Sequence, residues 1–490
     1  MQRTRTFRSF CSLAVLTLIL GWIWTSCTKK IDSQPTDQMV TIRMSIATDG
    51  SQGNGPVGNP AIPGFIDRAD LSDDGRFVVF SSSASNMVPN DNNNAADVFL
   101  RDNVLRTTTL VSINITGTGP ANAASWSPSI SGDGRFVAFI STATDISTNK
   151  SDSIQDIFVR DMQLGITTLV SRASGALGVK SNGDSFGPRI SKSGRYVVFY
   201  SRATNLDPAD TDIAYDVYRR DYGDPTQLNF LTILISRASG QTALGVPNGA
   251  KGTGGGGTGS LNPSISRDGH IIVYESDAFN LVSTNPEGGP LTYSPSSTTV
   301  SNIYLRDATA NSSLRLSIAA PGGPSLDPDA LSQHATISGD GNSVTFQSMA
   351  ANIVFKTDHN PDIYWRDVRT PYTAPGTEIE SVHTSGVRAG SGCDYPVISE
   401  DGSMVIWDSP STSLVDNDTN GVRDVFVHDR NSGITSRPSV ATYGDQLNAQ
   451  SLRPAISGNS AYIVFYTEAS NAGDLDTNGA ADYYLRGPPF

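Results

Sequence analysis

Cysteine, histidine and charged side chains are scarce in this 490-residue chain, and each scarcity excludes a class of protein. Cys11 and Cys27 lie in or beside an N-terminal apolar segment, so Cys393 stands alone and no internal disulfide can form after processing. The histidines lack any His-x-x-x-His spacing, which argues against a zinc centre. Charged residues make up 17% of the chain and the net charge is −13, so the basic surface that nucleic-acid phosphates require is missing. We expect no nucleic-acid partner.

Long apolar runs are also missing, apart from residues 13–24, which are too few to cross a bilayer as a stable helix. A basic segment precedes this run, and small residues lead into Cys27 directly after it. The arrangement resembles a bacterial lipoprotein signal, with an ordinary secretory signal as the alternative. We predict that residues 1–26 are removed, that Cys27 is lipidated, and that residues 27–38 form a tether. The loss of Arg3, Arg5 and Arg8 would move the net charge from −13 to −16.

One motif is abundant, and residues 130–139 (ISGDGRFVAF) give its clearest copy. A short apolar segment ends in Ile-Ser or Leu-Ser, a polar turn follows, and an alternating apolar segment comes next. The serines of the seven copies are Ser72, Ser131, Ser191, Ser266, Ser338, Ser399 and Ser457. A repeat of this length, rich in β-branched and aromatic residues, is typical of an array of small β-sheets.

Each unit contains four strand signals. In the first unit they end at Leu71, then cover residues 76–81, 97–102 and 107–112. The Asp-Gly pair between the first two favours a two-residue hairpin turn with positive φ. Seven such units predict an all-β, seven-bladed β-propeller over residues 39–490, built from four-stranded antiparallel blades. The last unit lacks its fourth strand, and we predict that the strand at residues 39–45 completes that blade and closes the ring.

The three recurring segments of each unit resemble the TolB-type, WD40-like propeller repeat of bacterial envelope proteins. They read Ile-Ser-x-Asp-Gly-Arg-Phe/Tyr-Val-x-Phe, Asp-Val-Phe-Val-Arg-Asp and Thr-Thr-x-Val-Ser, and they cover nearly all of residues 39–490. The Gly-His and Trp-Asp signatures of true WD40 blades are missing, and TolB itself has six blades and an extra N-terminal domain. The resemblance therefore implies a propeller with a binding role, without implying TolB's own partners.

Residues that recur at a fixed place in every unit are expected to be structural. Residues 183–187 match the Gly-x-Ser-x-Gly nucleophile elbow, but Ser185 lies six residues before Ser191, and other units carry a serine at the same offset. Cys393 fills that place in the sixth unit, so it is interpreted as a serine replacement. We predict no catalytic residue and no obligatory cofactor.

The loop between the second and third strands carries Asp-x-Asn/Asp-x-x-x-Asp in four units. Oxygen ligands at this spacing suit calcium, although the glutamate that completes an EF-hand is missing. Alternatively, these side chains cap the turn by accepting bonds from its backbone amides. The candidate ligands are Asp91, Asn93 and Asp97; Asp210, Asp212 and Asp216; Asp418, Asn420 and Asp424; and Asp476, Asn478 and Asp482.

Insertions interrupt the repeat only around the fourth unit, at residues 237–260 and 279–301. Both fall on the propeller face that carries the Asp/Asn loops, and insertions on one face often mark a binding surface. We expect a non-enzymatic scaffold, lipid-anchored in the outer membrane toward the periplasm or cell surface, that binds an envelope protein or a glycan. The alternatives are a glycan lyase or hydrolase, with non-repeated side chains converging near the central channel, and a calcium-stabilised adhesin.

Overall fold

The structure is a computed structural model that describes residues 39–58, 67–175, 178–210, 212–222, 230–239, 259–278, 280–282, 300–320, 327–369, 376–473 and 475–490. The predicted signal segment, Cys27 and the tether lie outside these ranges, as does most of both fourth-unit insertions. Within the described ranges no helix is long and apolar enough to cross a membrane.

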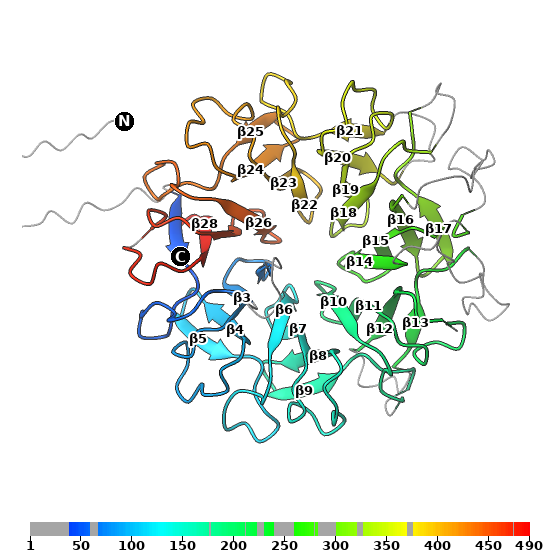
Figure 1. The fold of residues 1–490 in the computed structure, drawn as a ribbon, viewed down its shortest axis with the longest axis vertical. Coiled ribbons are helices and arrows are strands. Elements are labelled where there is room, and N and C mark those ends of the chain that lie inside the picture. The colour runs from blue at the N-terminus through cyan, green and yellow to red at the C-terminus, as the bar shows by residue number, and fades with distance from the viewer. Residues whose placement is uncertain are drawn as a thin grey trace, which may run out of the picture. The chain divides into compact units, whose positions relative to one another are not determined.

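Seven four-stranded antiparallel sheets form a ring around a central channel, as predicted (Figure 1). In blades one to six the strands follow the order of the sequence, and we name the strands of every blade a, b, c and d from the channel outward. Blade one contains β2 (Asp70–Leu71), β3 (Phe77–Ser82), β4 (Asp97–Asp102) and β5 (Thr107–Leu110). Blade two contains β6 (Ser125–Ile130), β7 (Phe136–Ser141), β8 (Asp156–Asp161) and β9 (Ile166–Leu169). Blade three contains β10 (Ser185–Ile190), β11 (Tyr196–Ser201), β12 (Asp216–Asp221) and β13 (Thr232–Leu234).

The remaining blades repeat this plan. Blade four contains β14 (Ser260–Ile265), β15 (Ile271–Ser276), β16 (Asn302–Asp307) and β17 (Ser312–Arg315). Blade five contains β18 (Ser332–Ile337), β19 (Ser343–Ser348), β20 (Asp362–Asp367) and β21 (Thr377–Ile379). Blade six contains β22 (Asp394–Ile398), β23 (Met404–Ser409), β24 (Asp424–Asp429) and β25 (Ile434–Ser436). Blade seven contains β26 (Ser451–Ile456), β27 (Ile463–Thr467), β28 (Asp482–Gly487) and β1 (Val40–Arg43).

The ring closes through its two chain ends, as the sequence predicts. β1 is the outer strand of blade seven and pairs antiparallel with β28, with Val40 opposite Gly487 and Arg43 opposite Tyr484. The ladder continues where the Met44 amide donates to the Tyr483 carbonyl at 2.8 Å. Closure satisfies a sheet edge that would otherwise be exposed, and it joins residues more than 400 apart in sequence without a disulfide.

Apolar side chains fill the spaces between neighbouring blades. Val79 and Val98 of blade one pack in the same buried cluster as Phe139 and Phe158 of blade two. Successive side chains on a strand point to opposite faces of the sheet, and a neighbouring blade covers each face. This is why strands b and c are buried almost throughout and not on alternate residues only.

The recurrent turn is longer than the two-residue hairpin that Asp-Gly favours. In blade two the Ser131 amide donates to the Phe136 carbonyl at 2.9 Å, so four residues form the loop. The Ser131 hydroxyl bonds Asp133 at 2.6 Å and accepts from the Phe136 amide at 2.9 Å. Gly134 has φ 76°, as the motif predicts for the glycine of the turn. The serine therefore closes the turn and has no free role.

Candidate functional site

Strand a bulges toward the channel in blades two to seven. In β6 the pairing with β7 shifts register between Trp126 and Ser129, and Ser127 within that gap has φ 56°. The same shift occurs in β10, β14, β18, β22 and β26. A bulge frees one residue from the ladder and re-aims its side chain. The freed positions therefore lie where the strands meet the channel.

The bulge position differs from blade to blade. It lies four residues before the turn serine and is occupied, from blade two to blade seven, by Ser127, Gly187, Asn262, His334, Tyr395 and Arg453, whose φ lies between 49° and 57°. Arg68 occupies the corresponding position of blade one, where the pairing shows no register shift. The repeat pattern does not mark these residues, because it consists of the residue types that the units share. The signal was present as a register position at which no residue type dominates.

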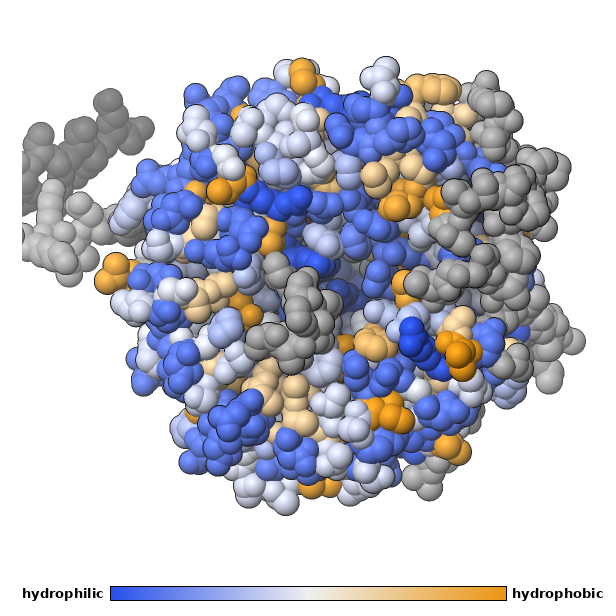
Figure 2. All heavy atoms as spheres, in the orientation of Figure 1, coloured by the Kyte–Doolittle hydropathy of each residue, from blue (hydrophilic) through white to orange (hydrophobic). Residues whose placement is uncertain are grey.

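These side chains surround a cavity of about 440 Å³ in the channel. Figure 2 shows hydrophilic residues bordering the hollow at the centre of the ring. Trp126 and Phe186 lie near the start of strand a, and Ile140 and Tyr200 lie near the end of strand b. These four lining residues place the cavity toward the face that carries the b–c and d–a loops. We call this face the loop face. The volume is in the range of small-molecule pockets.

One side of the cavity is basic. Arg68, Arg189 and Arg453 come from blades one, three and seven and line the same cavity. Burial lowers the pKa of Arg68 to about 9, and repulsion by Arg189 contributes to that shift. The Arg68 Nε is buried without a hydrogen-bond partner. Three positively charged side chains thus lie close together although they repel one another.

Buried carboxylates support the bulges from the preceding blade. Asp67 accepts from the Ser127 amide at 2.6 Å, and Glu275 accepts from the His334 amide at 2.6 Å. Asp408 accepts from the Arg453 amide at 3.1 Å. These bonds satisfy amides that the bulge removes from the ladder. Burial raises the pKa of Glu275 to about 7 and that of Asp408 to about 6, the latter against the opposing charge of Arg423.

Aromatic rings form part of the wall. His334 packs on Tyr395 with ring centroids 4.3 Å apart, and the Arg453 guanidinium lies 3.4 Å from the centroid of the Tyr395 ring. Phe186 stacks on Tyr200 at 5.4 Å. Burial lowers the pKa of His334 to about 4, so its imidazole is neutral at pH 7. The site thus combines flat apolar surfaces with cations.

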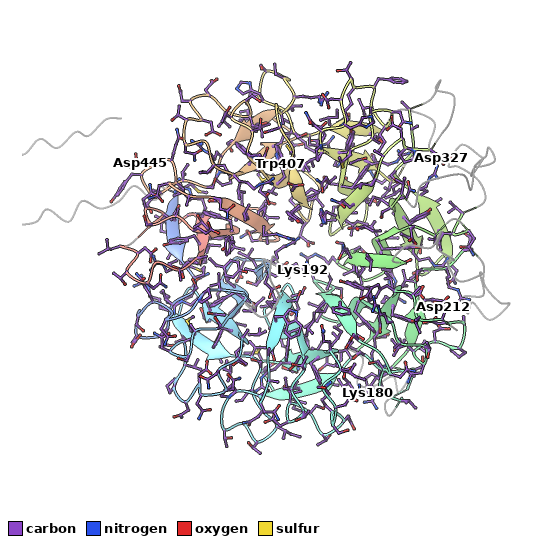
Figure 3. All side chains as sticks on the ribbon, viewed as in Figure 1. Lys180, Lys192, Asp212, Asp327, Trp407 and Asp445 are labelled. Carbon is purple, nitrogen blue, oxygen red and sulfur yellow. The ribbon has the colours of Figure 1, made fainter. Side chains whose placement is uncertain are left out.

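Ion pairs cross the channel at the opposite end, where the a–b turns meet. Arg267 of blade four binds Asp73 of blade one at 2.8 Å and Glu400 of blade six at 2.8 Å. Lys192 lies near the centre of the ring in Figure 3, and its Nζ donates to the Leu71 carbonyl at 2.8 Å. Charged side chains thus already occupy this end, and the cavity on the loop-face side is the better candidate for a ligand.

Within each of the four sets, the candidate calcium ligands lie close to one another. In two of the sets, however, an arginine already forms ion pairs with the aspartates. In blade six Arg437 lies 2.8 Å from Asp418 and 3.2 Å from Asp424. In blade seven Arg43 lies 3.2 Å from Asp482 and 3.7 Å from Asp476. The ligand atoms of Asp210, Asp212 and Asp216 in blade three lie within 4.8 Å of one another.

The blade-one loop and the last aspartate of each set favour the turn-capping alternative. Asn93 donates to Asp97 at 2.8 Å and to the Ala121 carbonyl, with Asp91 alongside. Asp97 also accepts from the Ser112 hydroxyl at 2.5 Å, and corresponding serine bonds reach Asp216, Asp424 and Asp482. The Asn420 and Asn478 side chains accept from backbone amides of their own loops. Calcium binding stays a prediction for these loops.

The recurrent serines and Cys393 are structural, as the register predicts. Ser185 lies in β10, fully buried, and donates to the Ser201 hydroxyl at 3.0 Å; no helix follows it. The partner is a serine of strand b, so the bond joins strands a and b within the blade. Cys393 is fully buried, and burial raises the pKa of its thiol to about 12, so the reactive thiolate is disfavoured.

Comparison with known proteins finds solved structures of low similarity. No family model and no curated protein sequence matches the chain. Among solved structures it matches TolB from Acinetobacter baumannii over 70% of this chain and 59% of that chain, with 14% identity and a TM-score of 0.36. The chain is similar in fold to TolB-type propellers.

Two other propellers match over a larger share of their length. Oligogalacturonate lyase from Vibrio parahaemolyticus matches over 91% of this chain and 93% of that chain, with 11% identity and a TM-score of 0.49. The propeller domain of the Trilobed protease from Pyrococcus furiosus matches over 88% and 93%, with 10% identity and a TM-score of 0.47. Identities this low show a common fold alone.

Proposed function

We propose that this protein is a non-enzymatic binding scaffold of the bacterial cell envelope, and that it engages an envelope protein or a glycan through its loop face. The observation that carries the proposal is the channel cavity on the loop-face side, where one register position holds six different residue types in seven blades although the blades themselves repeat. A purely structural ring needs no such variation. Side chains of a unique combination are what a specific ligand requires.

The proposed location rests on the sequence of the N-terminal segment. Residues 1–26 and Cys27 have the features of a lipoprotein signal, and lipidation would tether the propeller to the outer membrane through residues 27–38. Incorporation of labelled palmitate into the wild-type chain, and its loss in Cys27→Ala, would test the anchor. Export without labelling would favour the ordinary secretory signal.

An enzyme acting on a glycan in the channel is the second candidate. His334, Tyr395, Glu275 and Asp394 are non-repeated and gather at the cavity or directly behind it, as that alternative requires. However, Glu275 accepts two hydrogen bonds, from the His334 amide and from Asn262, and the His334 Nδ1 already bonds Gln347 at 2.8 Å. These contacts favour a supporting role for both groups over proton transfer.

Capture of envelope components by the purified propeller tests the proposal. The test variant is Tyr395→Ala, which alters the channel wall on the loop-face side. The matched control is Leu105→Ser, which alters a residue that is 64% exposed on a c–d turn of the opposite face. We expect captured material to be lost with Tyr395→Ala and retained with Leu105→Ser. Equal capture by both variants would contradict the loop face as the binding surface. Shortening of a supplied glycan would favour the enzyme.

A further inference from the structure

The three arginines of the channel are partly buried, and among the described residues none has a carboxylate within ion-pair distance. Arg453 occupies the bulge position and Arg68 the corresponding position of blade one, and Arg189 lies on β10 two residues after its own bulge. Among the described residues no carboxylate forms an ion pair with any of the three. By contrast, Arg267 and Arg423 each form ion pairs with two carboxylates. A buried cation without a close counter-ion carries a desolvation cost.

The acidic groups nearest to this cluster are committed to other contacts. Asp67 accepts from the Ser81 hydroxyl and the Ser127 amide, both at 2.6 Å. Asp70 accepts from the Ile130 amide at 3.0 Å and lies 3.4 Å from the Lys192 Nζ. Burial opposes ionisation of Asp70, but Lys192 and Arg68 lower its pKa to about 2. Asp67 itself lines the cavity, and the charge of Arg189 acts on both carboxylates. Neither carboxylate can move to pair directly with an arginine without leaving a scaffold amide unsatisfied.

The Arg68 side chain adds an independent sign of an unfilled site. Its Nε is buried and has no hydrogen-bond partner, although unsatisfied polar atoms of this kind are rare in folded proteins. The guanidinium offers a planar fork of donors that matches a carboxylate. An anion in the cavity would satisfy this donor and offset the repulsion among the three arginines.

The rest of the lining indicates what the anion is attached to. Trp126, Phe186 and Tyr200 of blades two and three supply flat apolar surface, while Ser264 and Thr336 of blades four and five supply hydroxyl groups. A cavity of about 440 Å³ admits a ligand of one or two rings. The lining therefore suits a compact body that carries both apolar and hydroxyl-bonding surface.

We infer that the channel cavity binds a compact carboxylate ligand, with Arg68, Arg189 and Arg453 receiving the carboxylate. The ligand is a sugar acid or a small organic acid, since both carry the group that the arginines recognise. The inference rests on the proposed function, because it takes the loop-face cavity as the place of binding.

Isothermal titration calorimetry of the full propeller tests this assignment with glucuronate, glucose and succinate as probes. We expect glucuronate or succinate to bind and glucose, which lacks the carboxylate, not to bind. Arg189→Gln and Arg453→Gln should each weaken binding roughly 10- to 100-fold, the usual loss for a charged hydrogen bond. Arg369→Gln is the matched control, because Arg369 is exposed and pairs only with Asp367. Tighter binding of glucuronate identifies a sugar acid, and tighter binding of succinate identifies an organic acid.

Three results would overturn the inference: no binding of either carboxylate at millimolar concentration, equal binding of glucuronate and glucose, or unchanged affinity in the double variant Arg189→Gln/Arg453→Gln. If that variant fails to fold, the salt dependence of wild-type binding decides, since recognition by three cations must weaken as ionic strength rises. Should carboxylates fail while capture by the loop face still depends on Tyr395, the scaffold survives and this inference falls. Failure of both would overturn the proposed function as well.

Discussion

The b–c loops and the channel belong to the same blades, yet their charged side chains differ in whether they form ion pairs. In blades two, five, six and seven a lysine or arginine binds the last aspartate of the b–c loop, as Lys150 binds Asp156 at 2.8 Å. The cation comes from the b–c loop itself in blades two and five, and from the end of the outer strand in blades six and seven. In the channel, Arg68, Arg189 and Arg453 have no such partner among the described residues. The loops are therefore complete within the protein, and the channel has charge available for a ligand.

Breaking a completed loop should have the largest effect on stability. Asp156 is fully buried and binds Lys150 and Lys180 while accepting from two serine hydroxyls. Asp156→Ala leaves the buried Lys150 ammonium with only the partly exposed Asp152 as a counter-ion, and we expect a loss of about 3–5 kcal/mol. Denaturant unfolding measures it, with Asp152→Ala as control because Asp152 is 41% exposed at its side chain. Equal losses in the two variants would contradict the assignment.

The stability of the protein should depend on pH through Glu275, a buried carboxyl group next to the channel. Burial raises the pKa of Glu275 from 4.5 to about 7, so the folded state keeps this proton to higher pH than the unfolded state. The stabilisation is thus complete below about pH 4.5 and is lost as the pH rises through 7. Between pH 5 and 8 we expect the wild type to lose about 2–3 kcal/mol more than Glu275→Gln.

Denaturant unfolding at several pH values measures this difference. Glu378→Gln is the matched control, because Glu378 is exposed and pairs with Arg430 at the outer part of the blade. Its pH profile should follow that of the wild type. A profile of Glu275→Gln that also follows the wild type would show that Glu275 ionises without cost to the fold.

Calcium should discriminate among the loops themselves. In blade six Arg437 already holds Asp418 and Asp424, so Asp418→Asn should leave any calcium response unchanged. If the blade-three set binds calcium, the ion should stabilise the wild type by about 1–2 kcal/mol at ten times its dissociation constant, and Asp212→Asn should remove that gain. Thermal melting with calcium or a chelator measures both variants. No shift in the wild type would refute the predicted sites.

Replacing Cys393 should have the smallest effect. Serine occupies the corresponding place in five other blades, so Cys393→Ser should change stability by less than about 1 kcal/mol. The native thiol should also resist a thiol-specific reagent until the protein unfolds, because it is fully buried. Rapid modification of the native protein would contradict a purely structural role.

Repeated positions were predictable from the sequence and varied positions were not. The serine of each turn and the last aspartate of each b–c loop recur at fixed spacing, and the structure gives each a local hydrogen bond. The arginine cluster gave no such signal, because Arg68, Arg189 and Arg453 lie 121 and 264 residues apart along the chain. Neither their spacing nor their neighbours mark them as a group.

The sequence by itself determined the number of blades, the four strands in each blade and the closure by residues 39–45. These features depend on local patterns, namely strand alternation, turn residues and a count of repeats. Only the tertiary structure decided which side chains share the channel, because ring closure brings together one position from every blade. It also decided that the bulge turns this position inward, since the bulge arises from how strand a pairs with strand b and not from strand a alone.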